Sequence, residues 1–329
     1  MGSESPRRVI FYADADHLRQ CEKDDVDDLG RYCAETAEYL RDVDQLSTPY
    51  LFQYGDKALT DGLGVVNLPH MRKTRGIATT QQVSRVTSDD ASCHPQPLTD
   101  RLEPIVVPIS ASVRVAALPQ VAPNDIPWEQ KKGLALFRGS QRRCDERDPY
   151  NHKSTDFEKC QNFRRCRFVW MFSESKLVDA RITDFKPDVE LQNATVIGGR
   201  TIVGKGLSMK EQLEYKMLVM IEGNDIATGL MWALLSNSVV LMAPPEFVTF
   251  FMEELLEPWV HYVPFRPDYS DVEEKVQWVL DHEEEAKLIA ERATLWVHDL
   301  IDYPEDSEQV RKEVLRRYAM HFVETNRIS

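Results

Sequence analysis

The segment Tyr215–Met242, YKMLVMIEGNDIATGLMWALLSNSVVLM, contains the pattern that decides the fold. It begins with a short apolar run, Leu218–Ile221, which has the length of a buried strand. The turn-forming residues EGND follow, and their aspartate, Asp225, is a suitable N-cap for a helix over Ile226–Leu235. A second apolar run, Val239–Met242, completes the pattern. Strand, turn, helix and strand in this order predict a βαβ crossover, the unit from which parallel α/β sheets are built.

The turn over Glu222–Asp225 lies where α/β proteins place ligands, beyond the carboxyl end of a strand. The free N–H groups and the positive dipole end of the following helix would suit a phosphate. The turn lacks the full glycine fingerprint of dinucleotide-binding proteins. A βαβ unit without a ligand is therefore an equal alternative on this pattern alone.

The composition is that of an ordinary soluble globular protein. The 329 residues are 42% hydrophobic and 29% charged, and they accommodate one large or two medium domains. A net charge of −14 argues against a general nucleic-acid or anionic-membrane binder, but it allows a local basic pocket. We find no apolar run long enough to span a bilayer and no recognisable signal peptide. A cytoplasmic location is slightly favoured, with a trimmed secretory-pathway protein as the alternative.

Cysteine spacing indicates neither a zinc site nor a dense disulfide framework, because none of the six cysteines forms a CxxC pair. This spacing somewhat favours a reducing compartment, although a bridge between Cys160 and Cys166 stays open. No cluster of potential metal ligands stands out, so we expect no metal site. Nothing resembles the GxSxG motif of a serine hydrolase either.

A proline-rich stretch predicts the boundary between two domains. Pro119, Pro123 and Pro127 fall close together, which is typical of a linker. We therefore expect a first domain over residues 1–122 and a second over 123–307. A last helix over Gln309–Glu324, within residues 308–329, would be able to pack back against the first domain.

An aspartate in the first domain has a position typical of working residues. Asp56 follows the predicted strand Tyr50–Tyr54 and a glycine, and α/β folds place functional side chains just beyond strand ends. An ordinary turn aspartate is the alternative.

A basic cluster follows the predicted strand Leu134–Phe137. The strand leads into Arg138-Gly139-Ser140, and further arginines follow at positions 142, 143 and 147. A Gly-Ser turn and nearby guanidinium groups can hold a phosphate through backbone N–H groups and paired hydrogen bonds. A salt-bridged surface turn is the alternative.

Three further elements bear on the site. Helical spacing predicts a charged helix over Asp156–Arg167, with Arg164, Arg165 and Arg167 on its solvated face. An amphipathic helix is predicted over Glu246–Leu256 and an aromatic-rich strand over Trp259–Pro264. His261, within that strand, is more typical of a hydrogen-bonded core histidine than of a catalyst.

Three segments carry a resemblance to a known family when they are taken in order. They are LALFRGSQRRCDERDPYN from Leu134, LEYKMLVMIEGNDIATGLMWALLSNSVVLM from Leu213 and LLEPWVHYVPFRPDYSDVEEKVQWVLDHEEEAKLIAERA from Leu255. Together they resemble glycosyltransferase family 90, over roughly Pro127–Val297. That family includes the protein O-glucosyltransferases of the secretory pathway and the capsule-associated xylosyltransferases of fungi.

This resemblance implies an α/β fold of the GT-B type, with two Rossmann-like domains facing each other across a cleft. It also implies an inverting glycosyltransferase that moves xylose or glucose from a UDP-sugar to a hydroxyl of a glycan or glycoprotein acceptor. Neither an obligatory metal nor another cofactor is implied, and nucleic acid is not an expected partner.

The resemblance also implies roles for individual residues. Ser140 and Arg147 would bind the nucleotide diphosphate, and Asp56 would be the general base. The remaining predicted donor-site residues are Arg138, Gly139, Glu222, Gly223, Asn224, Asp225, Ala227, Thr228 and His261.

The chain departs from the family pattern on its central helix. Gly229 stands where many relatives have an arginine, and Met231 stands at a position that is often basic. Compensating charge would have to come from Arg147, from Arg142 or Arg143, or from the basic residues of the first domain, Arg72, Lys73 and Arg75. A catalytically degenerate protein that binds a nucleotide or glycan is the alternative function.

Overall fold

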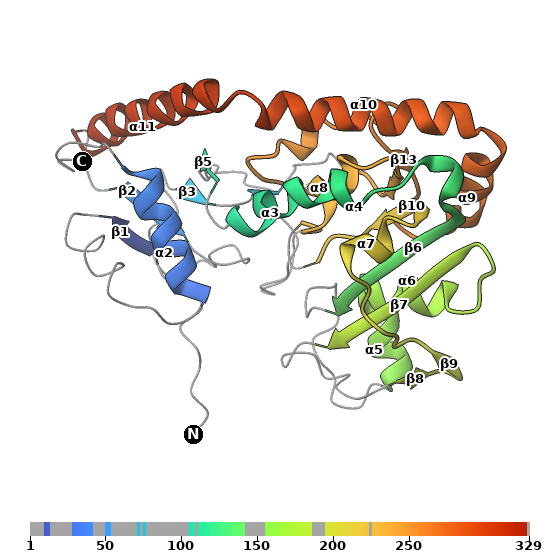
Figure 1. Ribbon diagram of the computed structural model, residues 1–329. Coiled ribbons are helices and arrows are strands. Elements are labelled where there is room, and N and C mark those ends of the chain that lie inside the picture. The colour runs from blue at the N-terminus through green and yellow to red at the C-terminus, as the bar shows by residue number, and fades with distance from the viewer. Residues whose placement is uncertain are drawn as a thin grey trace.

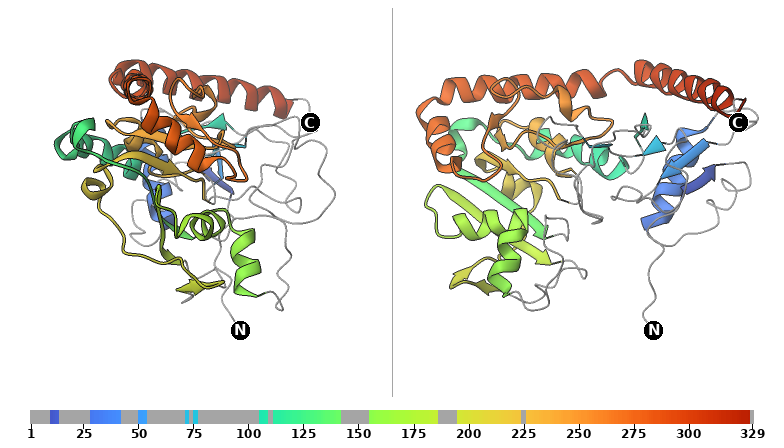
Figure 2. Two further views of the ribbon diagram at one scale, coloured as in Figure 1. Left: turned by 90° about the vertical axis from the view of Figure 1, so that its right-hand side faces the viewer. Right: turned by 180° about the vertical axis from the view of Figure 1, so that it is seen from behind.

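The computed structural model describes residues 10–13, 28–41, 50–53, 71–72, 75–76, 105–108, 111–141, 155–185, 195–223 and 226–327. Within these ranges the chain forms two main sheets, one from each half of the sequence. Two long helices, α10 (Glu283–Ile301) and α11 (Pro304–Arg327), run one after the other along a single side of the molecule (Figure 1, Figure 2).

The second half is built on a five-stranded sheet in the order β13-β11-β10-β6-β7, and every neighbouring pair is parallel. The strands are β6 (Lys132–Gln141), β7 (Val178–Phe185), β10 (Tyr215–Met220), β11 (Val239–Met242) and β13 (Val263–Pro264). The predicted βαβ unit is confirmed, since β10 pairs with β11 in parallel with Met217 opposite Val239. The α/β class is confirmed with it.

The apolar runs of the central strands are continuous because both faces of the sheet are buried. In β10, Met217 and Val219 point into one core with α6 (Arg164–Phe172) and α9 (Val272–Asp281). Leu218 points into a second core with α8 (Leu230–Leu234) and α10. Short elements connect these layers. They are α3 (Ser112–Ala117), α4 (Val121–Asn124), α5 (Asp156–Asn162), β8 (Val196–Ile197), β9 (Arg200–Thr201) and α7 (Met209–Gln212), with 3₁₀ turns at Leu118–Gln120, Trp128–Gln130 and Glu253–Leu255.

The first half contains a smaller sheet in the order β1-β2-β3-β5. Its strands are β1 (Ile10–Ala13), β2 (Tyr50–Gln53), β3 (Met71–Arg72) and β5 (Ile105–Val106), and only β1 is antiparallel to its neighbour. The helix α2 (Asp28–Tyr39) shares a core with this sheet. The halves are also joined directly, because β4 (Arg75–Gly76) pairs with β12 (Phe247–Val248).

The last helix, α11, packs on the first half. Tyr318 stacks on Tyr50 with ring centroids 5.1 Å apart. Arg311 donates from Nη1 to the carbonyl oxygens of Tyr39 at 2.6 Å and Arg41 at 3.1 Å, so it caps the end of α2. The last helix therefore packs against the first half of the chain. The domain division at residue 122 stays a prediction.

The predicted helix over Glu246–Leu256 is wrong. That segment contains the two-residue strand β12, a turn with Met252 in the left-handed region, and one 3₁₀ turn. The buried Glu253 accepts hydrogen bonds from the Thr249 amide and hydroxyl, which closes the turn. Pairing with β4, a contact distant in sequence, overrides the helical spacing.

Two other predicted elements differ in length. The helix expected over Asp156–Arg167 is two helices, α5 and α6, separated at Phe163, whose backbone is extended. The predicted strand over Trp259–Pro264 is a turn that ends in the two-residue β13, and Trp259 there has a φ of 65°.

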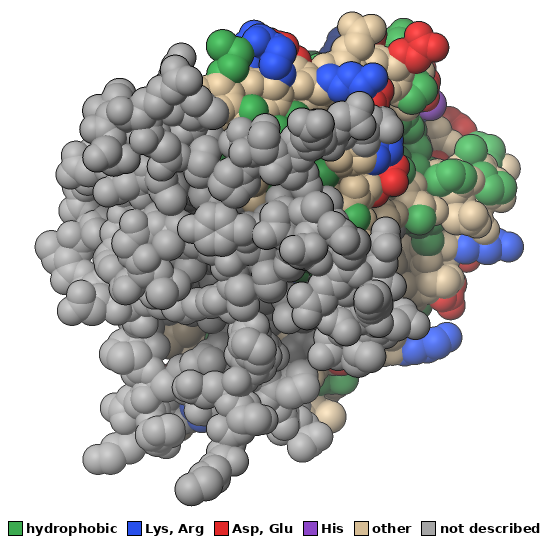
Figure 3. Space-filling model, turned by 90° about the vertical axis from the view of Figure 1, so that its left-hand side faces the viewer, with side chains coloured by type: hydrophobic (Ala, Val, Ile, Leu, Met, Phe, Trp, Pro, Cys, Tyr) green, Lys and Arg blue, Asp and Glu red, His purple; other side chains and the backbone are tan. Residues whose placement is uncertain are grey.

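Neither a membrane span nor a metal site emerges from the described residues. Their helices include none long and apolar enough to cross a bilayer. Their histidine, cysteine and acidic side chains form no group able to hold a metal ion. In Figure 3 the described Lys and Arg side chains lie interspersed with Asp and Glu.

We predict that Tyr318→Ala destabilises the protein by about 3–5 kcal/mol, because it removes a fully buried aromatic ring from the contact between α11 and the first sheet. Val310→Ala, which truncates an exposed side chain on the same helix, is the control and should change stability by less than about 0.5 kcal/mol. Urea unfolding measures both. Equal stability of the two variants would show that the α11 contact contributes little.

Candidate functional site

The candidate site lies at the carboxyl ends of β6 and β10, the edge where parallel sheets bind ligands. Gly139 and Ser140 belong to β6 itself, with a bulge between Gly139 and Gln141. The predicted turn at these residues is therefore wrong, because the strand continues through them. Ile221, Glu222 and Gly223 follow β10 directly.

Arg165 joins these two strand ends. Its Nε and Nη2 donate to the carbonyl oxygen of Ile221 at 3.1 and 2.8 Å, and its Nη1 donates to that of Ser140 at 2.9 Å. One half-buried guanidinium group thus binds a carbonyl near the end of each strand. Its planar fork suits two acceptors that lie in different directions.

Gly223 lies directly beside this guanidinium group. A Cβ atom at Gly223 would lie 2.9 Å from Nη2 of Arg165, which is closer than real contacts allow. At Gly139 a Cβ would lie 3.8 Å from Nη1, so it would only touch the group. A side chain at position 223 would therefore require the guanidinium group of Arg165 to shift.

Arg164, the preceding residue, holds two carboxylates at the same edge. Its Nη2 lies 2.7 Å from Glu246 and its Nη1 lies 3.4 Å from Glu222. Glu222 Oε1 also accepts the amides of Glu246 at 3.0 Å and Phe247 at 3.2 Å. Glu222 therefore ties the end of β10 to the segment that follows β11.

The environment of Glu222 disfavours its charge. Burial raises the pKa of this carboxyl to about 8, and the neighbouring Glu246 acts in the same direction. Arg164 and the two amide donors oppose this increase in pKa. At this pKa the Glu222 carboxyl holds a proton at neutral pH that an exposed glutamate would lose.

Arg138 is bound to Asp179 of the neighbouring strand β7. Its Nη2 lies 2.8 Å from the Asp179 carboxylate and its Nη1 donates to the Asp179 carbonyl. The hydroxyl of Tyr215 donates to the same carboxylate at 3.0 Å. This arrangement ties β6 to β7 and β10.

The segment before β11 contains a shorter helix than the sequence predicts. The helix α8 has five residues and begins after Gly229, so the predicted helix start at Ile226 is wrong. Ala227 is buried and Thr228 is exposed, while Met231 is 3% exposed within the core. A Cβ at Gly229 would lie 3.1 Å from Nε1 of Trp232, so a larger residue would need Trp232 to move.

His261 lies in the turn before β13. Its Nδ1 accepts the amide of Glu257 at 2.9 Å, and its ring lies 6.1 Å from that of Trp296. Burial lowers the pKa of its imidazole, opposed by the charge of Glu257. These contacts do not bring it to Arg165 or Gly223.

Several predicted site residues fall outside the described part of the chain. They are Asp56, Lys73, Arg142, Arg143, Arg147, Asn224 and Asp225. Of the basic residues proposed from the first half, Arg75 lies 3.1 Å from the carboxylate of Glu254, in the 3₁₀ turn that follows β12.

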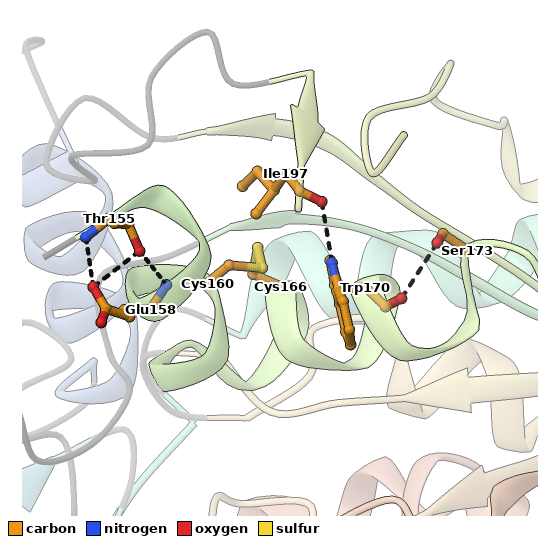
Figure 4. Close-up of a disulfide and its surroundings, with 7 residues drawn as sticks. All are labelled: Thr155, Glu158, Cys160, Cys166, Trp170, Ser173 and Ile197. Carbon is orange, nitrogen blue, oxygen red and sulfur yellow. Dashed lines mark hydrogen bonds between the residues drawn. A yellow bond between two sulfur atoms is a disulfide. The ribbon is translucent and has the colours of Figure 1, made fainter. Parts of the chain in front are cut away.

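The described cysteines are bonded. Cys160 at the end of α5 and Cys166 in the first turn of α6 form a disulfide (Figure 4), and Cys33 is also in a disulfide. Within the described ranges no cysteine is free. The bridge left open by the sequence therefore exists, and the preference for a reducing compartment is not supported.

Arg164 and Arg165 were missed because they were assigned to a solvated face, which is wrong. The second helix begins after Phe163, and in it Arg165 shares a face with the core residues Phe168, Val169 and Phe172. The spacing of three, four and seven residues between Arg165 and these core positions was the sequence signal that could have placed it on the buried face. Arg167 is half-buried as well, with its guanidinium carbon 5.1 Å above the Tyr269 ring.

The pKa of Glu222 predicts how stability depends on pH. A raised pKa means that the folded state binds a proton that the unfolded state has lost, between about pH 4.3 and about 8. Its contribution is thus complete below this range and is lost as pH rises through it. The slope of the free energy of unfolding should become less negative in Glu222→Gln, by up to about 1.4 kcal/mol per pH unit.

Urea unfolding of the wild type and of Glu222→Gln between pH 5 and 8 measures the two slopes. The slopes are compared and not the absolute free energies of unfolding, because replacing the carboxyl with an amide also alters the contact with Arg164. Parallel curves would contradict the raised pKa.

Comparisons with known proteins bear on this site. The family model described as glycosyl transferase family 90 matches residues 113–323. An O-glucosyltransferase LpsA of Dichelobacter nodosus is 30% identical over 175 residues, which are 53% of this chain and 46% of that protein. Protein O-glucosyltransferase 2 of Danio rerio is 37% identical over 166 residues, or 50% of this chain and 28% of that protein.

Among solved structures, a sucrose-phosphate synthase from Thermosynechococcus elongatus aligns with 65% of this chain and 49% of its own. Its TM-score is 0.34 and its identity 11%, a similarity too low to bear on the fold.

The family match includes the ends of β6 and β10, both arginines at the start of α6 and the whole five-stranded sheet. It extends over more than half of the chain, although the chain spans less than half the length of the two relatives. On this match, the chain belongs to glycosyltransferase family 90.

Proposed function

We propose that this chain is an inverting glycosyltransferase that moves a sugar from a UDP-sugar to a hydroxyl of a glycan or glycoprotein acceptor. The observation that carries the proposal is the family match over the parallel sheet and its carboxyl edge. The relatives named as O-glucosyltransferases favour glucose over xylose as the transferred sugar.

In the proposed donor site the nucleotide lies at the ends of β6 and β10. Ser140 and Arg147 bind the diphosphate, as the family resemblance implies, and the backbone around Glu222 and Gly223 lines the site. Gly229 and the buried Met231 leave α8 without a cation, so arginines from other segments must carry the positive charge. Such groups stabilise the charge that develops on the leaving diphosphate, and no metal is required in this scheme.

Asp56 is the proposed general base. It takes the proton of the acceptor hydroxyl while the acceptor oxygen forms a bond to the anomeric carbon. The bond from that carbon to the diphosphate oxygen breaks, and UDP leaves with the electron pair. Attack from the face opposite UDP inverts the anomeric configuration. General-base assistance of this kind contributes about 10²–10⁴-fold to the rate.

The disulfides favour an oxidising compartment for this activity, since such bonds persist outside reducing environments. An acceptor exposed in the same compartment, such as a glycan or a glycoprotein, is consistent with that location.

A binding protein without catalysis is the second candidate. It is favoured by Gly229 and Met231, at the start of α8, which replace residues that are often basic. It is also favoured by Arg164, whose charge the Glu246 carboxylate already balances. Release of UDP from a panel of UDP-sugars, with and without a glycan acceptor, separates the two. Turnover above background identifies a transferase, and tight binding of UDP without turnover identifies a binding protein.

We predict that Asp56→Asn lowers kcat by at least about 10²-fold and leaves the Kd for UDP unchanged, because the amide cannot accept the proton. Calorimetry with UDP and a UDP-release assay measure the two quantities. Asp61→Asn, in the same part of the chain, is the control and should retain its turnover. Normal turnover in Asp56→Asn would remove this residue from the chemistry.

We predict that Arg147→Ala raises the Kd for UDP by at least about 10-fold, which corresponds to the loss of one charge-assisted pair of hydrogen bonds. Arg147→Lys keeps the charge without the paired geometry and should bind UDP with intermediate affinity. Unchanged affinity in Arg147→Ala by calorimetry would exclude this residue from the donor site.

A further inference from the structure

Two features that the proposed chemistry does not use lie next to each other at the start of α6. One is the pair Arg164 and Arg165, which hold the ends of β6 and β10 and the segment after β11. The other is the disulfide between Cys160 and Cys166, which are both fully buried. Arg165 directly precedes Cys166, so the bridge and the arginines belong to the same helical turn.

The disulfide closes the joint between two helices. Phe163 is extended, so α5 ends there and α6 starts in a new direction. Each helix is fixed separately at its far end (Figure 4). A capping box of Thr155 and Glu158 starts α5, and Trp170 Nε1 in α6 donates to the carbonyl of Ile197 at 3.1 Å. The bridge is the covalent constraint on the joint between these two anchored ends.

The position of that joint sets the position of both arginines. Arg165 reaches the carbonyls of Ser140 and Ile221, and its Nη2 lies only 2.9 Å from the place that a Cβ atom at Gly223 would take. A rotation of the first turn of α6 would therefore break these hydrogen bonds. Their loss would release the backbone that lines the proposed nucleotide site.

We propose that Arg165 is a positioning residue of the donor site, and that the Cys160–Cys166 disulfide holds it in register with the ends of β6 and β10. This inference rests on the proposed function. Arg165 acts through the backbone of Ser140 and Ile221 rather than by touching the nucleotide. The disulfide thus supports UDP binding as well as stability.

Arginine is required here for its shape. Its fork donates to two carbonyls at once, whereas the single ammonium group of a lysine cannot reproduce that geometry. Arg165→Lys keeps the charge and the disulfide, so it tests position apart from charge. We expect the Kd for UDP to rise by about 10-fold or more in this variant, because the backbone that lines the site would be displaced.

The second variant, Cys160→Ala with Cys166→Ala, removes the bridge without adding a polar group to the core. Its control is Val279→Ala, which truncates a fully buried side chain of α9 in the same core but away from the joint. We expect the double variant to bind UDP about 10-fold more weakly and the control to bind within about twofold of the wild type. Circular dichroism establishes that each variant is folded.

Combining Arg165→Lys with the two cysteine substitutions gives the most specific readout. If the bridge acts through Arg165, the combined loss of UDP affinity equals that of Arg165→Lys alone, because both changes disrupt one arrangement. Independent effects would instead multiply, to about 100-fold, and would overturn the role of the bridge in positioning Arg165. If the cysteine variant does not fold, Arg165→Lys still tests the positioning role.

These measurements distinguish a failure of the positioning role from a failure of the proposed function. If the wild type binds UDP and Arg165→Lys binds it equally well, the positioning role is wrong and the proposed function stands. If the wild type binds neither UDP nor a UDP-sugar by calorimetry, the proposed function fails and this inference fails with it.

Discussion

The carboxyl edge of the five-stranded sheet depends on one guanidinium group. Parallel strands leave their last carbonyls without partners where the ladder ends, and partly buried carbonyls need donors. Arg165 donates to the carbonyls of Ser140, next to the end of β6, and of Ile221, just after β10, so it links the ends of two strands that the ladder already pairs. A side chain at position 223 would require this guanidinium group to shift. The proposed nucleotide site is built around this arrangement.

Charge at this edge is balanced before any ligand binds. Arg164 is paired with Glu222 and Glu246, and burial keeps the pKa of Glu222 near 8. Since α8 is short and its Met231 lies in the core, it offers no cation to a diphosphate. The proposed site therefore relies on the arginines after β6. This division, with structural arginines on α6 and ligand-binding arginines elsewhere, explains how a protein of net charge −14 would attract an anion.

Local patterns predicted the strands well and the helices of the second half only partly. The pairing of β10 with β11 followed from two apolar runs of strand length, since both faces of that sheet are buried. The helix over Glu246–Leu256 failed because β12 pairs with β4, some 170 residues away in sequence, and no local signal encodes that contact. Gly139, Ser140 and Gly223 were predicted from motif and family resemblance, and the structure places them beside Arg165, whereas Arg164 and Arg165 were not predicted. Their role depends on the break at Phe163, which a continuous charged pattern conceals.

A crystal structure of the protein with UDP would show whether the nucleotide binds at this edge of the sheet. We expect the diphosphate beside Ser140 and the backbone of Glu222 and Gly223, with Arg165 still bound to the carbonyls of Ser140 and Ile221. UDP at another edge of the sheet, or a diphosphate bound directly by Arg165 after it has left those carbonyls, would show that this arrangement is wrong.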